Sequence, residues 1–538
     1  MPTPESCRGS GRGSNSPAVT SQSWVWLAVS AVLLLFANGA NTIPLAAWLA
    51  PVFLLRFVRT QKYALGITVA YVLLTAEFAF QFRGMVPIPG IAYYIFLVIW
   101  GIPLVVPLLI DRLVAHRLNG LKATLVFPTA WAATEYLLSN GPYATWGSIA
   151  YSQYGNLPLL QLVSVTGLWG ITFLIGWIAA VCNWLWQAGL EHAPARRAAW
   201  FCTGTIASVI LLGGARMTLL PPSSHTVRVA SISKSEVAPW PSDAIVRRLF
   251  DGTASSADLN SFQAWYAMND DDLLIRAERE MKAGAAIVFW GETNGFASKE
   301  DEGAFVARGA ELAAKYHAYL GMAMGVWNVG KKPPLENKLV LIEPDGKVAW
   351  EYDKAHPVPG PEAANQVPGD RKMRVLSTPY GRMTSIICFD GDFPQLLAQA
   401  GTLGADMVLD PSNDWRAIDP WHTQMASFRA IEQGVNLIRQ TSRGMSAAYD
   451  YQGRRLAAMD HFQTADYAMI SEIPTKGVHT IYSRLGNWFA LTCLGALMLL
   501  VILSLRGKRD KKAGGAPHAG RKSGDNHPGI CSIGCLQS

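Results

Sequence analysis

The chain has 538 residues, of which 50% are apolar and only 16% are charged, and its mean hydropathy is +0.17. The apolar content excludes a disordered chain. A soluble protein carries about 25% charged residues, so the low charge indicates that part of this chain lies in a bilayer. The length is too great for a single globular domain. The net charge of +7 gathers partly after Leu505, which favours an anionic membrane surface and not nucleic acid as a partner.

The hydropathy pattern predicts eight membrane spans. A flexible arm, rich in Ser, Gly, Pro and Arg, occupies residues 1–23. Seven apolar stretches then predict a seven-helix membrane domain over 24–214, and an eighth predicts a C-terminal membrane helix over 485–505, because a span needs about 20 apolar residues. A basic flexible tail follows over 506–538. The seven stretches are 24–38, 43–58, 63–82, 91–110, 123–139, 160–186 and 198–214.

Basic residues mark one side of these spans. Lys and Arg accumulate on the cytoplasmic side of a membrane. Here they follow the second, fourth, sixth and eighth spans, whereas the alternate loops contain hardly any. We therefore expect both termini inside and the region 215–484 outside. An alternative makes 24–38 a cleaved signal peptide that ends near Ala37-Asn38-Gly39-Ala40, without changing the side of the later loops.

The region 225–480 has the composition of a globular domain and alternates β-rich with helical stretches. Such alternation predicts an α/β or α+β layered domain with buried sheets. Turn signals at Pro344-Asp345-Gly346 and Gln452-Gly453 indicate hairpins. The expected strands are 226–232, 285–290, 318–326, 338–343, 382–389, 405–410, 435–441 and 446–450, and the expected helices are 258–283, 301–316, 394–402 and 420–433.

The only cysteine of this region, Cys388, ends an apolar strand and precedes Phe389-Asp390-Gly391. A residue in that position has rigid support and access to a cleft, as a nucleophile requires. A lone cysteine is more often a small buried apolar side chain. On its position alone, Cys388 remains open to both interpretations.

Two charged residues favour the catalytic interpretation. Glu292 follows the apolar stretch 285–290, where a carboxylate that loses hydration becomes a usable general base. Lys354 lies in a proline-restrained loop, where a fixed positive charge would stabilise a thiolate and an oxyanion. Taken singly, each residue is equally compatible with an ordinary surface or ion-paired side chain.

Glu292, Lys354 and Cys388, in this chain order, together resemble the nitrilase (carbon–nitrogen hydrolase) superfamily. The segment Pro411-Ser412-Asn413-Asp414-Trp415 is similar to the segment that follows the nucleophile in that superfamily. The resemblance to one membrane branch, apolipoprotein N-acyltransferase, is closer and covers about residues 24–505. It is carried by Tyr352, Lys354, His356, Val358, Pro359 and Glu362 in the lysine motif, and by Phe127, Pro128, Trp131, Glu135, Tyr136, Trp146, Gly147, Gln161, Gly167, Gly170 and Phe173 in the membrane half.

This resemblance implies a multi-span α-helical bundle with a nitrilase-like αββα sandwich on the periplasmic side of a bacterial cytoplasmic (inner) membrane. It implies an acyltransferase without a cofactor. The acyl chain of a phospholipid would pass through a thioester on Cys388 to the N-terminal amine of a diacylglyceryl lipoprotein. Glu292 would act as the base, and Lys354 with the N–H after Cys388 would stabilise the oxyanion. Glu362 would support Lys354, and Phe389 and Trp415 would line the mouth of the site.

The chain departs from the family at Cys388-Phe389-Asp390, where the family usually has Cys-Tyr-Glu and where this chain is more similar to soluble amidases. A first rival is therefore a membrane-tethered extracytoplasmic amidase or nitrilase that hydrolyses a carbon–nitrogen bond, although one span would suffice as its tether. A second rival, a non-catalytic scaffold or transporter, is disfavoured by the Glu–Lys–Cys set. No metal site is expected, because the histidines lack paired ligand spacing. The sequence leaves the oligomeric state open.

Overall fold

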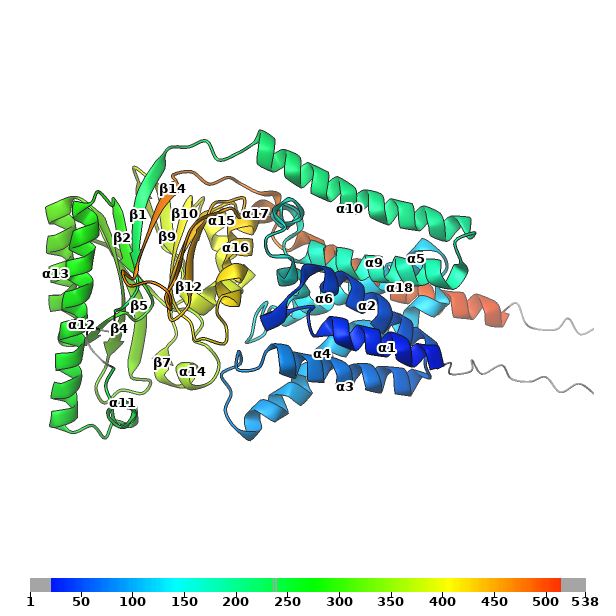
Figure 1. The fold of residues 1–538 in the computed structure, drawn as a ribbon, viewed down its shortest axis with the longest axis horizontal. Helices are drawn as coiled ribbons and strands as arrows, with labels where there is room; N and C mark the ends of the chain where they lie inside the picture. Colours follow the sequence, from blue (N-terminus) through cyan, green and yellow to red (C-terminus); the bar gives the residue numbers. More distant parts are fainter. Residues whose placement is uncertain (1–20, 236, 238–239, 514–538) are drawn as a thin grey trace, which may run out of the picture.

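The computed structural model describes residues 21–513, apart from 236 and 238–239. A helical bundle and a two-sheet domain lie side by side along the long axis of the molecule (Figure 1). Helices α1 (Ser21–Leu34) and α18 (Trp488–Ala513) both reach the end of the bundle that is farthest from the sheets (Figure 1). Most of the predicted arm and the end of the predicted tail lie outside the described residues.

Each of the eight predicted spans contains the greater part of one longer helix of the bundle, and the fifth, sixth and eighth spans also reach into shorter helices. Five described helices are long and apolar enough to cross a membrane, namely 63–81, 91–117, 169–188, 193–219 and 488–506. Three others, α1, α2 and α6, have only 14, 17 and 13 residues, so the eight-span topology remains a prediction. The remaining bundle helices are α2 (Pro44–Thr60), α3 (Tyr63–Gln81), α4 (Ile91–Val114), α5 (Leu121–Thr124), α6 (Val126–Leu138), α7 (Leu157–Leu160), α8 (Val163–Thr166), α9 (Trp169–Ala188) and α10 (Ala193–Leu219).

Three predicted boundaries differ from the structure. The sixth span, predicted from residue 160, begins only at Trp169, because α8 ends at Gly167 with φ +67°. A side chain there would approach the Tyr482 ring to 2.5 Å, so only glycine permits this contact. Helix α18 continues to Ala513, since the basic residues of the predicted flexible tail are good helix formers. Helix α1 likewise starts at Ser21, inside the predicted arm.

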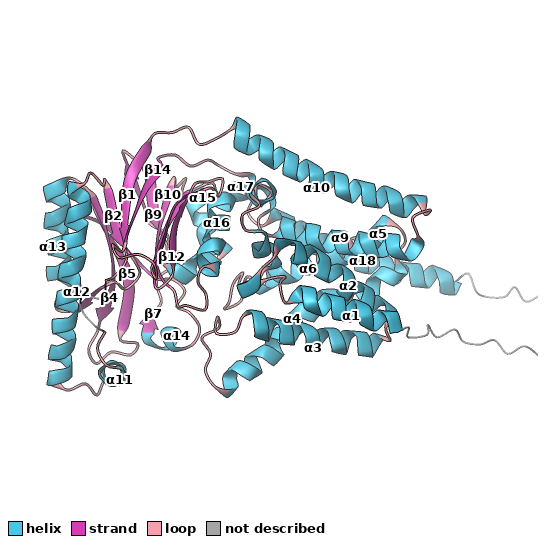
Figure 2. Ribbon diagram, viewed as in Figure 1, coloured by secondary structure: helices cyan, strands magenta, loops and turns pink. Residues whose placement is uncertain are grey.

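The second half of the chain is a sandwich of two sheets between two helical layers (Figure 2). One sheet has the order β14-β1-β2-β4-β5-β6, with β3 paired to β4 and β7 to β5, and the other has the order β13-β12-β11-β10-β9-β8. Helices α12 and α13 cover the first sheet, and α15 and α16 cover the second (Figure 2). This αββα layering confirms the predicted fold class.

The elements of the sandwich are β1 (Thr226–Ile232), α11 (Asp243–Asp251), α12 (Ser256–Lys282), β2 (Ile287–Trp290), β3 (Gly295–Ser298), α13 (Glu302–Tyr316), β4 (Tyr319–Trp327), β5 (Leu335–Ile342), β6 (Val348–Asp353), α14 (Pro361–Asn365), β7 (Gln366–Val367), β8 (Val375–Thr378), β9 (Gly381–Ser385), α15 (Pro394–Thr402), β10 (Met407–Asn413), α16 (Trp421–Gln433), β11 (Asn436–Ser442), β12 (Met445–Tyr449), β13 (Arg455–Asp460) and β14 (Ala468–Pro474), followed by α17 (Ile481–Leu485).

Alternating side chains hold the layers together. In β2, Ile287 and Phe289 enter the core between the sheets, whereas Val288 and Trp290 pack in a second cluster with residues of α12. Strand β10 repeats the pattern with Leu409 between the sheets. This follows from the period of two along a strand. Because β1, β2 and β4 are parallel, as are β9, β10 and β11, the carboxyl ends of the central strands meet at common edges.

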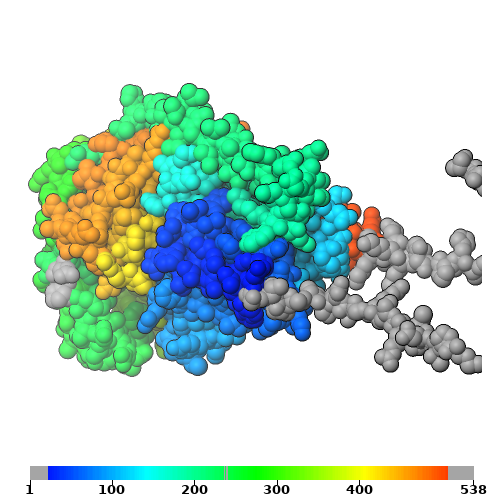
Figure 3. All heavy atoms as spheres, turned by 45° about the vertical axis from the view of Figure 1, so that its right-hand side comes forward, coloured from blue at the N-terminus to red at the C-terminus, as the bar shows by residue number. Residues whose placement is uncertain are grey.

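A continuous core joins the sandwich to the bundle. Phe78, Phe82 and Trp146 of the bundle belong to the same hydrophobic cluster as Trp421 and Phe428 of α16. The loop after α6 also reaches the sandwich, since Thr145 donates through Oγ1 to the carbonyl of Asp392, 2.8 Å away. In the space-filling view the N-terminal helices (blue) press directly against the sandwich (yellow and orange) (Figure 3). The two halves therefore meet in a packed interface.

Candidate active site

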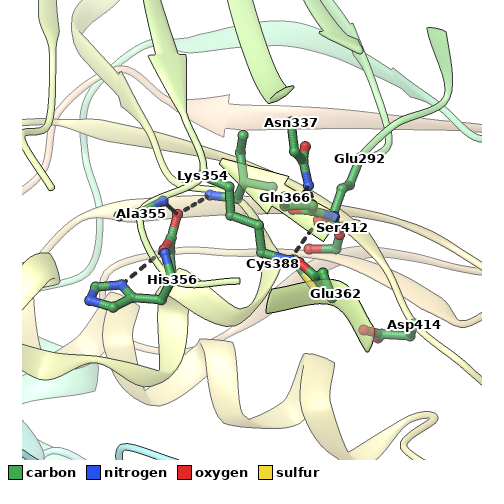
Figure 4. Close-up of polar contacts among 12 residues, drawn as sticks. Glu292, Asn337, Lys354, Ala355, His356, Glu362, Gln366, Cys388, Ser412 and Asp414 are labelled. Carbon is green, nitrogen blue, oxygen red and sulfur yellow. Dashed lines mark hydrogen bonds and ion pairs between the residues drawn. The ribbon is translucent and has the colours of Figure 1, made fainter. Parts of the chain in front are cut away.

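The structure brings together the three residues that the sequence singled out, Glu292, Lys354 and Cys388 (Figure 4). Glu292 follows β2, Lys354 follows β6 and Cys388 follows β9. Lys354 Nζ lies 2.8 Å from Glu292 Oε1. Their residues are only 4%, 1% and 4% exposed in chain order. A buried acid, a buried ammonium and a thiol thus share one site.

The turn Cys388–Asp392 presents the cysteine. The sequence predicted a strand through residue 389, which is wrong, because β9 ends at Ser385 and a 3₁₀ turn starts at Cys388. Side chains take the N–H groups that a continued strand would use: Cys388 donates its N–H to Asp410 Oδ1 at 2.9 Å, and Ile387 donates to Asp390 Oδ2 at 3.2 Å. Cys388 has φ +52°, a left-handed conformation that is costly for a residue with a Cβ and is held by these contacts.

Lys354 links two carboxylates. Its ammonium group contacts Glu362 as well as Glu292, and Glu292 also accepts a hydrogen bond from Asn337 Nδ2 at 2.6 Å (Figure 4). Burial would lower the pKa of Lys354, but the two carboxylates raise it well above its usual value. The lysine therefore stays charged. Burial raises the pKa of Glu362, against the opposing charge of Lys354.

The resting cysteine is a thiol. Burial, together with the nearby Glu292 carboxylate, raises the pKa of Cys388 well above its usual value, and the positive charges of Lys354 and Arg439 oppose this only in part. A nucleophile in this state needs a base to remove its proton at the moment of attack. Glu292, the predicted base, is a buried carboxylate whose charge acts on this thiol.

Asp390 joins the lysine loop to the cysteine turn, a role that the sequence analysis did not assign. One carboxylate oxygen accepts from Tyr352 Oη at 2.7 Å, and the other accepts from the His356 N–H at 2.8 Å. The side chain also accepts from the Ala355 N–H at 3.2 Å. Asp390 is fully buried. The only sequence signal was its place two residues after the predicted nucleophile.

A second polar network lies beside the thiol and was not predicted as part of the site. Arg439 donates through Nη1 to Asp410 at 2.8 Å, and through Nη2 to Asp414 at 3.0 Å. His422 of α16 lies 2.9 Å from Asp414. Among the described residues, Cys388, Asp414 and His422 form a group whose ligand-type atoms lie within 4.8 Å of one another. The Arg439 guanidinium contacts all three residues, so its positive charge already occupies the place where a metal ion would bind them.

The thiol opens into a pocket that both halves of the protein line. The space between atoms at this pocket, including its open mouth, is about 440 Å³. Glu362, Phe389 and Trp415, the predicted supporting residues, all line it, and Trp415 is anchored by donating from Nε1 to the Gly84 carbonyl at 2.7 Å. The bundle contributes Met85, Val86, Pro87, Tyr143 and Trp146, and the sandwich also contributes Val358, Asn413, Ile418 and His422.

A larger apolar cavity lies inside the bundle. It spans about 1100 Å³ of space between atoms, including space open to the outside, and its lining is mostly apolar. This cavity and the pocket of Cys388 are separate spaces, and Trp146 lines both of them.

Comparisons with known proteins agree with this architecture. The carbon–nitrogen hydrolase family model matches residues 267–478, so the sandwich defines a protein of the nitrilase class. The model of the apolipoprotein N-acyltransferase N-terminal domain matches residues 30–181 of the bundle. The chain belongs to the apolipoprotein N-acyltransferase family of the nitrilase superfamily.

Its relatives carry the same family name. An apolipoprotein N-acyltransferase of Geobacter metallireducens is 26% identical over 420 residues, covering 72% of this chain and 76% of that protein. Apolipoprotein N-acyltransferase 2 of Treponema pallidum is 24% identical over 415 residues, covering 68% and 73%. The solved structure of an amidase from Nesterenkonia sp. matches 47% of this chain and 92% of its own, with 18% identity and a TM-score of 0.38.

Proposed function

We propose that this protein acylates the N-terminal amine of a diacylglyceryl-cysteine on lipoproteins, with a phospholipid as acyl donor and a thioester on Cys388 as intermediate. The observation that carries the proposal is the construction of the pocket. Five bundle residues, among them Tyr143 and Trp146, form one wall around the thiol. A hydrolase of small water-soluble amides needs no wall built from the loops that join membrane helices, whereas an enzyme with two lipid substrates does.

In the first half-reaction, Glu292 takes the thiol proton and the sulfur of Cys388 attacks the ester carbonyl of the phospholipid. Lys354 and the N–H of Phe389 stabilise the oxyanion, because the N–H of Cys388 itself is donated to Asp410. The ester C–O bond then breaks. The departing oxygen of the lysophospholipid takes the proton from Glu292, and the acyl chain stays on the sulfur.

In the second half-reaction, the free amine of the lipoprotein attacks the thioester carbonyl. Glu292 removes a proton from the attacking nitrogen, and the C–S bond breaks as the amide forms. The sulfur then recovers the proton from Glu292. Charge and protons balance over the cycle, so the proposed steps require no cofactor.

The supporting residues keep the roles that the family resemblance implies. Glu362 contacts the Lys354 ammonium and so fixes the lysine beside the reacting carbonyl. Phe389 and Trp415 line the pocket and would pack against the acyl chain. The apolar cavity behind Trp146 has the chemistry of an acyl-chain site.

We place the protein in the bacterial cytoplasmic membrane, with the sandwich on the extracytoplasmic side. Two observations support this topology. The basic loops follow alternate spans. The start of α1 and the end of α18 both lie far from the sandwich, as they would if both termini were cytoplasmic (Figure 1).

The test is incubation of purified protein with a labelled phospholipid and a diacylated lipopeptide. The expected result is a triacylated peptide and a lysophospholipid in equal amounts. Cys388→Ala is the inactive control. Continuous release of free fatty acid without labelled peptide would instead indicate a hydrolase and would exclude the transferase.

A further inference from the structure

Arg439, in the middle of β11, lies close to the sulfur of Cys388. The residue is 1% exposed, and its Nη2 is 3.9 Å from Cys388 Sγ. The same nitrogen lies 3.0 Å from Asp414 Oδ1 and 2.8 Å from His422 Nδ1. A guanidinium is always charged and presents its donors in a rigid plane, so this cation is held in one orientation towards the sulfur.

Charged groups face the sulfur from several elements. Glu292 and Lys354 come from the ends of β2 and β6, and Glu362 comes from α14. Strand β10 and the residue after it contribute Asp410 and Asp414, α16 contributes His422, β11 contributes Arg439, and the cysteine turn contributes Asp392. In Figure 4, Lys354 and Asp414 lie on opposite sides of Cys388. The two permanent cations of this set are Lys354 and Arg439, and Arg439 is paired with Asp414.

Lys354 is already committed to two carboxylates, Glu292 and Glu362. When a proton passes from the thiol to Glu292, the sulfur becomes an anion on a residue that is only 4% exposed. An anion in such a place is costly unless a cation or a hydrogen-bond donor faces it. Arg439 faces it, and Asp410 and Asp414 prevent the guanidinium from turning away.

We propose that Arg439 is a second cationic partner of the Cys388 thiolate, in addition to Lys354. The inference rests on the proposed function in one respect, since it takes Cys388 as the nucleophile. Arg439 would stabilise the thiolate both before it attacks and when it leaves at the end of the cycle. Asp414 would position the guanidinium and partly oppose its effect on the sulfur.

The thiol can be tested without any lipid substrate. Full-length protein in detergent is alkylated with iodoacetamide between about pH 6 and pH 10, and modification of the Cys388 peptide is followed by mass spectrometry. Arg439→Gln should slow alkylation near neutral pH by about tenfold or more, which corresponds to a rise of at least about one unit in the apparent pKa of the thiol. Asp414→Asn should change the rate in the opposite direction, because it removes a negative charge near the sulfur.

Arg429→Gln is the matched control. Arg429 is another arginine that is 1% exposed and paired with a carboxylate, Glu432, but it lies on α16 and makes no hydrogen bond to the sulfur. Its replacement should lower stability and leave the alkylation profile of Cys388 unchanged. If Arg439→Gln behaves in the same way, Arg439 is only structural and the inference is wrong.

A charge-balanced variant covers the case in which Arg439→Gln does not fold. Arg439→Gln combined with Asp414→Asn removes both partners of an ion pair, which is tolerated better than removal of one. This double variant should be alkylated more slowly than Asp414→Asn alone; an equal rate would overturn the inference. Failure of the proposed function is recognised separately, because an active Cys388→Ser protein would exclude the thioester whatever the alkylation profile shows.

Discussion

The backbone N–H of Cys388 donates to the side chain of Asp410 on β10 and not to a backbone carbonyl of that strand. The other oxygen of the same carboxylate holds Arg439. Asp410 therefore positions the backbone of the proposed nucleophile and the cation beside its sulfur with one rigid group. The cysteine can leave the sheet at this point without leaving an N–H unpaired in the interior.

Cys388→Ser should abolish acyl transfer and leave the protein folded, because a hydroxyl with this base is a far poorer nucleophile than a thiol. Transfer to a lipopeptide and thermal unfolding should be measured on the same preparation. Cys493→Ser, which replaces a buried cysteine of α18, is the matched control and should retain activity. Near-normal transfer by Cys388→Ser would remove this residue from the mechanism.

Glu292→Gln should fail to form an acyl-enzyme when phospholipid is supplied alone, since the thiol would keep its proton. Wild-type protein should accumulate a fatty-acyl mass on Cys388, because the pocket excludes water and the thioester waits for an amine. Intact-protein mass spectrometry distinguishes these results. Glu302→Gln, which removes a carboxylate that pairs with Lys338, should acylate like the wild type.

Lys354→Met should form the same acyl-enzyme at least about a hundredfold more slowly, because loss of one oxyanion stabiliser costs on the order of 3 kcal/mol. The single-turnover rate of thioester formation is the appropriate measurement. Lys338→Met serves as the control, since this buried lysine pairs with glutamates outside the pocket. An unchanged rate in Lys354→Met would show that the oxyanion is stabilised elsewhere.

Asp390→Ala should weaken the connection between the lysine loop and the cysteine turn. It leaves Tyr352 Oη and the N–H groups of Ala355 and His356 without their acceptor, so the free energy of unfolding should fall by about 1–3 kcal/mol. Acyl-enzyme formation should also slow. Asp345→Ala, in an exposed turn, should change neither quantity. Wild-type values for Asp390→Ala would mean that the two loops hold their positions independently.

Asp270 makes the stability of the sandwich depend on pH. Burial raises the pKa of this carboxyl to about 8 in the folded protein, above its usual value of 3.8. The folded state therefore holds the proton more tightly, and its contribution to stability is full below about pH 4 and is lost as the pH rises through 8. Asp270→Asn should unfold at a temperature that varies less between these pH values than in the wild type. Parallel curves for the two proteins would contradict this.

A protease site placed in the exposed turn at Asp345 should be cut from outside in intact spheroplasts, whereas a tag joined after Ala513 should be protected. Both outcomes follow from the proposed topology, in which the sandwich is extracytoplasmic. Digestion of permeabilised cells, where both sites should be cut, controls for accessibility. Cleavage of the C-terminal tag in intact cells would reverse the orientation.

The sequence predicted the parts of the molecule that carry a strong apolar signal. The sequence predicted the central strands and their helices. Glu292 and Cys388 stood out because each follows or ends a β-rich stretch, and Lys354 stood out because it lies in a proline-restrained loop. The sequence did not reveal β6, β8, β13 and β14 as strands in their own right. These four are the outermost strands of the two sheet orders, and three of them have at most one buried residue each, so they lack a continuous apolar run.

The sequence did not predict the second polar network, around Arg439 and His422, for a different reason. Arg439 lies within a predicted strand and His422 within a predicted helix, and neither position suggests an approach to Cys388. Their proximity arises because β9, β10 and β11 are neighbours and α16 packs over them. Contacts of this kind depend on the order of strands in the sheet, which hydrophobic periodicity does not encode.

The bond from Thr145 to the carbonyl of Asp392 connects a loop of the bundle to the turn that carries the proposed nucleophile. Together with the pocket wall that the bundle supplies, it makes assembly in the bilayer a precondition for chemistry. A chain that has been synthesised but not yet inserted would hold an incomplete site. Under the proposed function, such a chain would be unable to acylate amines in the cytosol, and the reaction would be confined to the membrane.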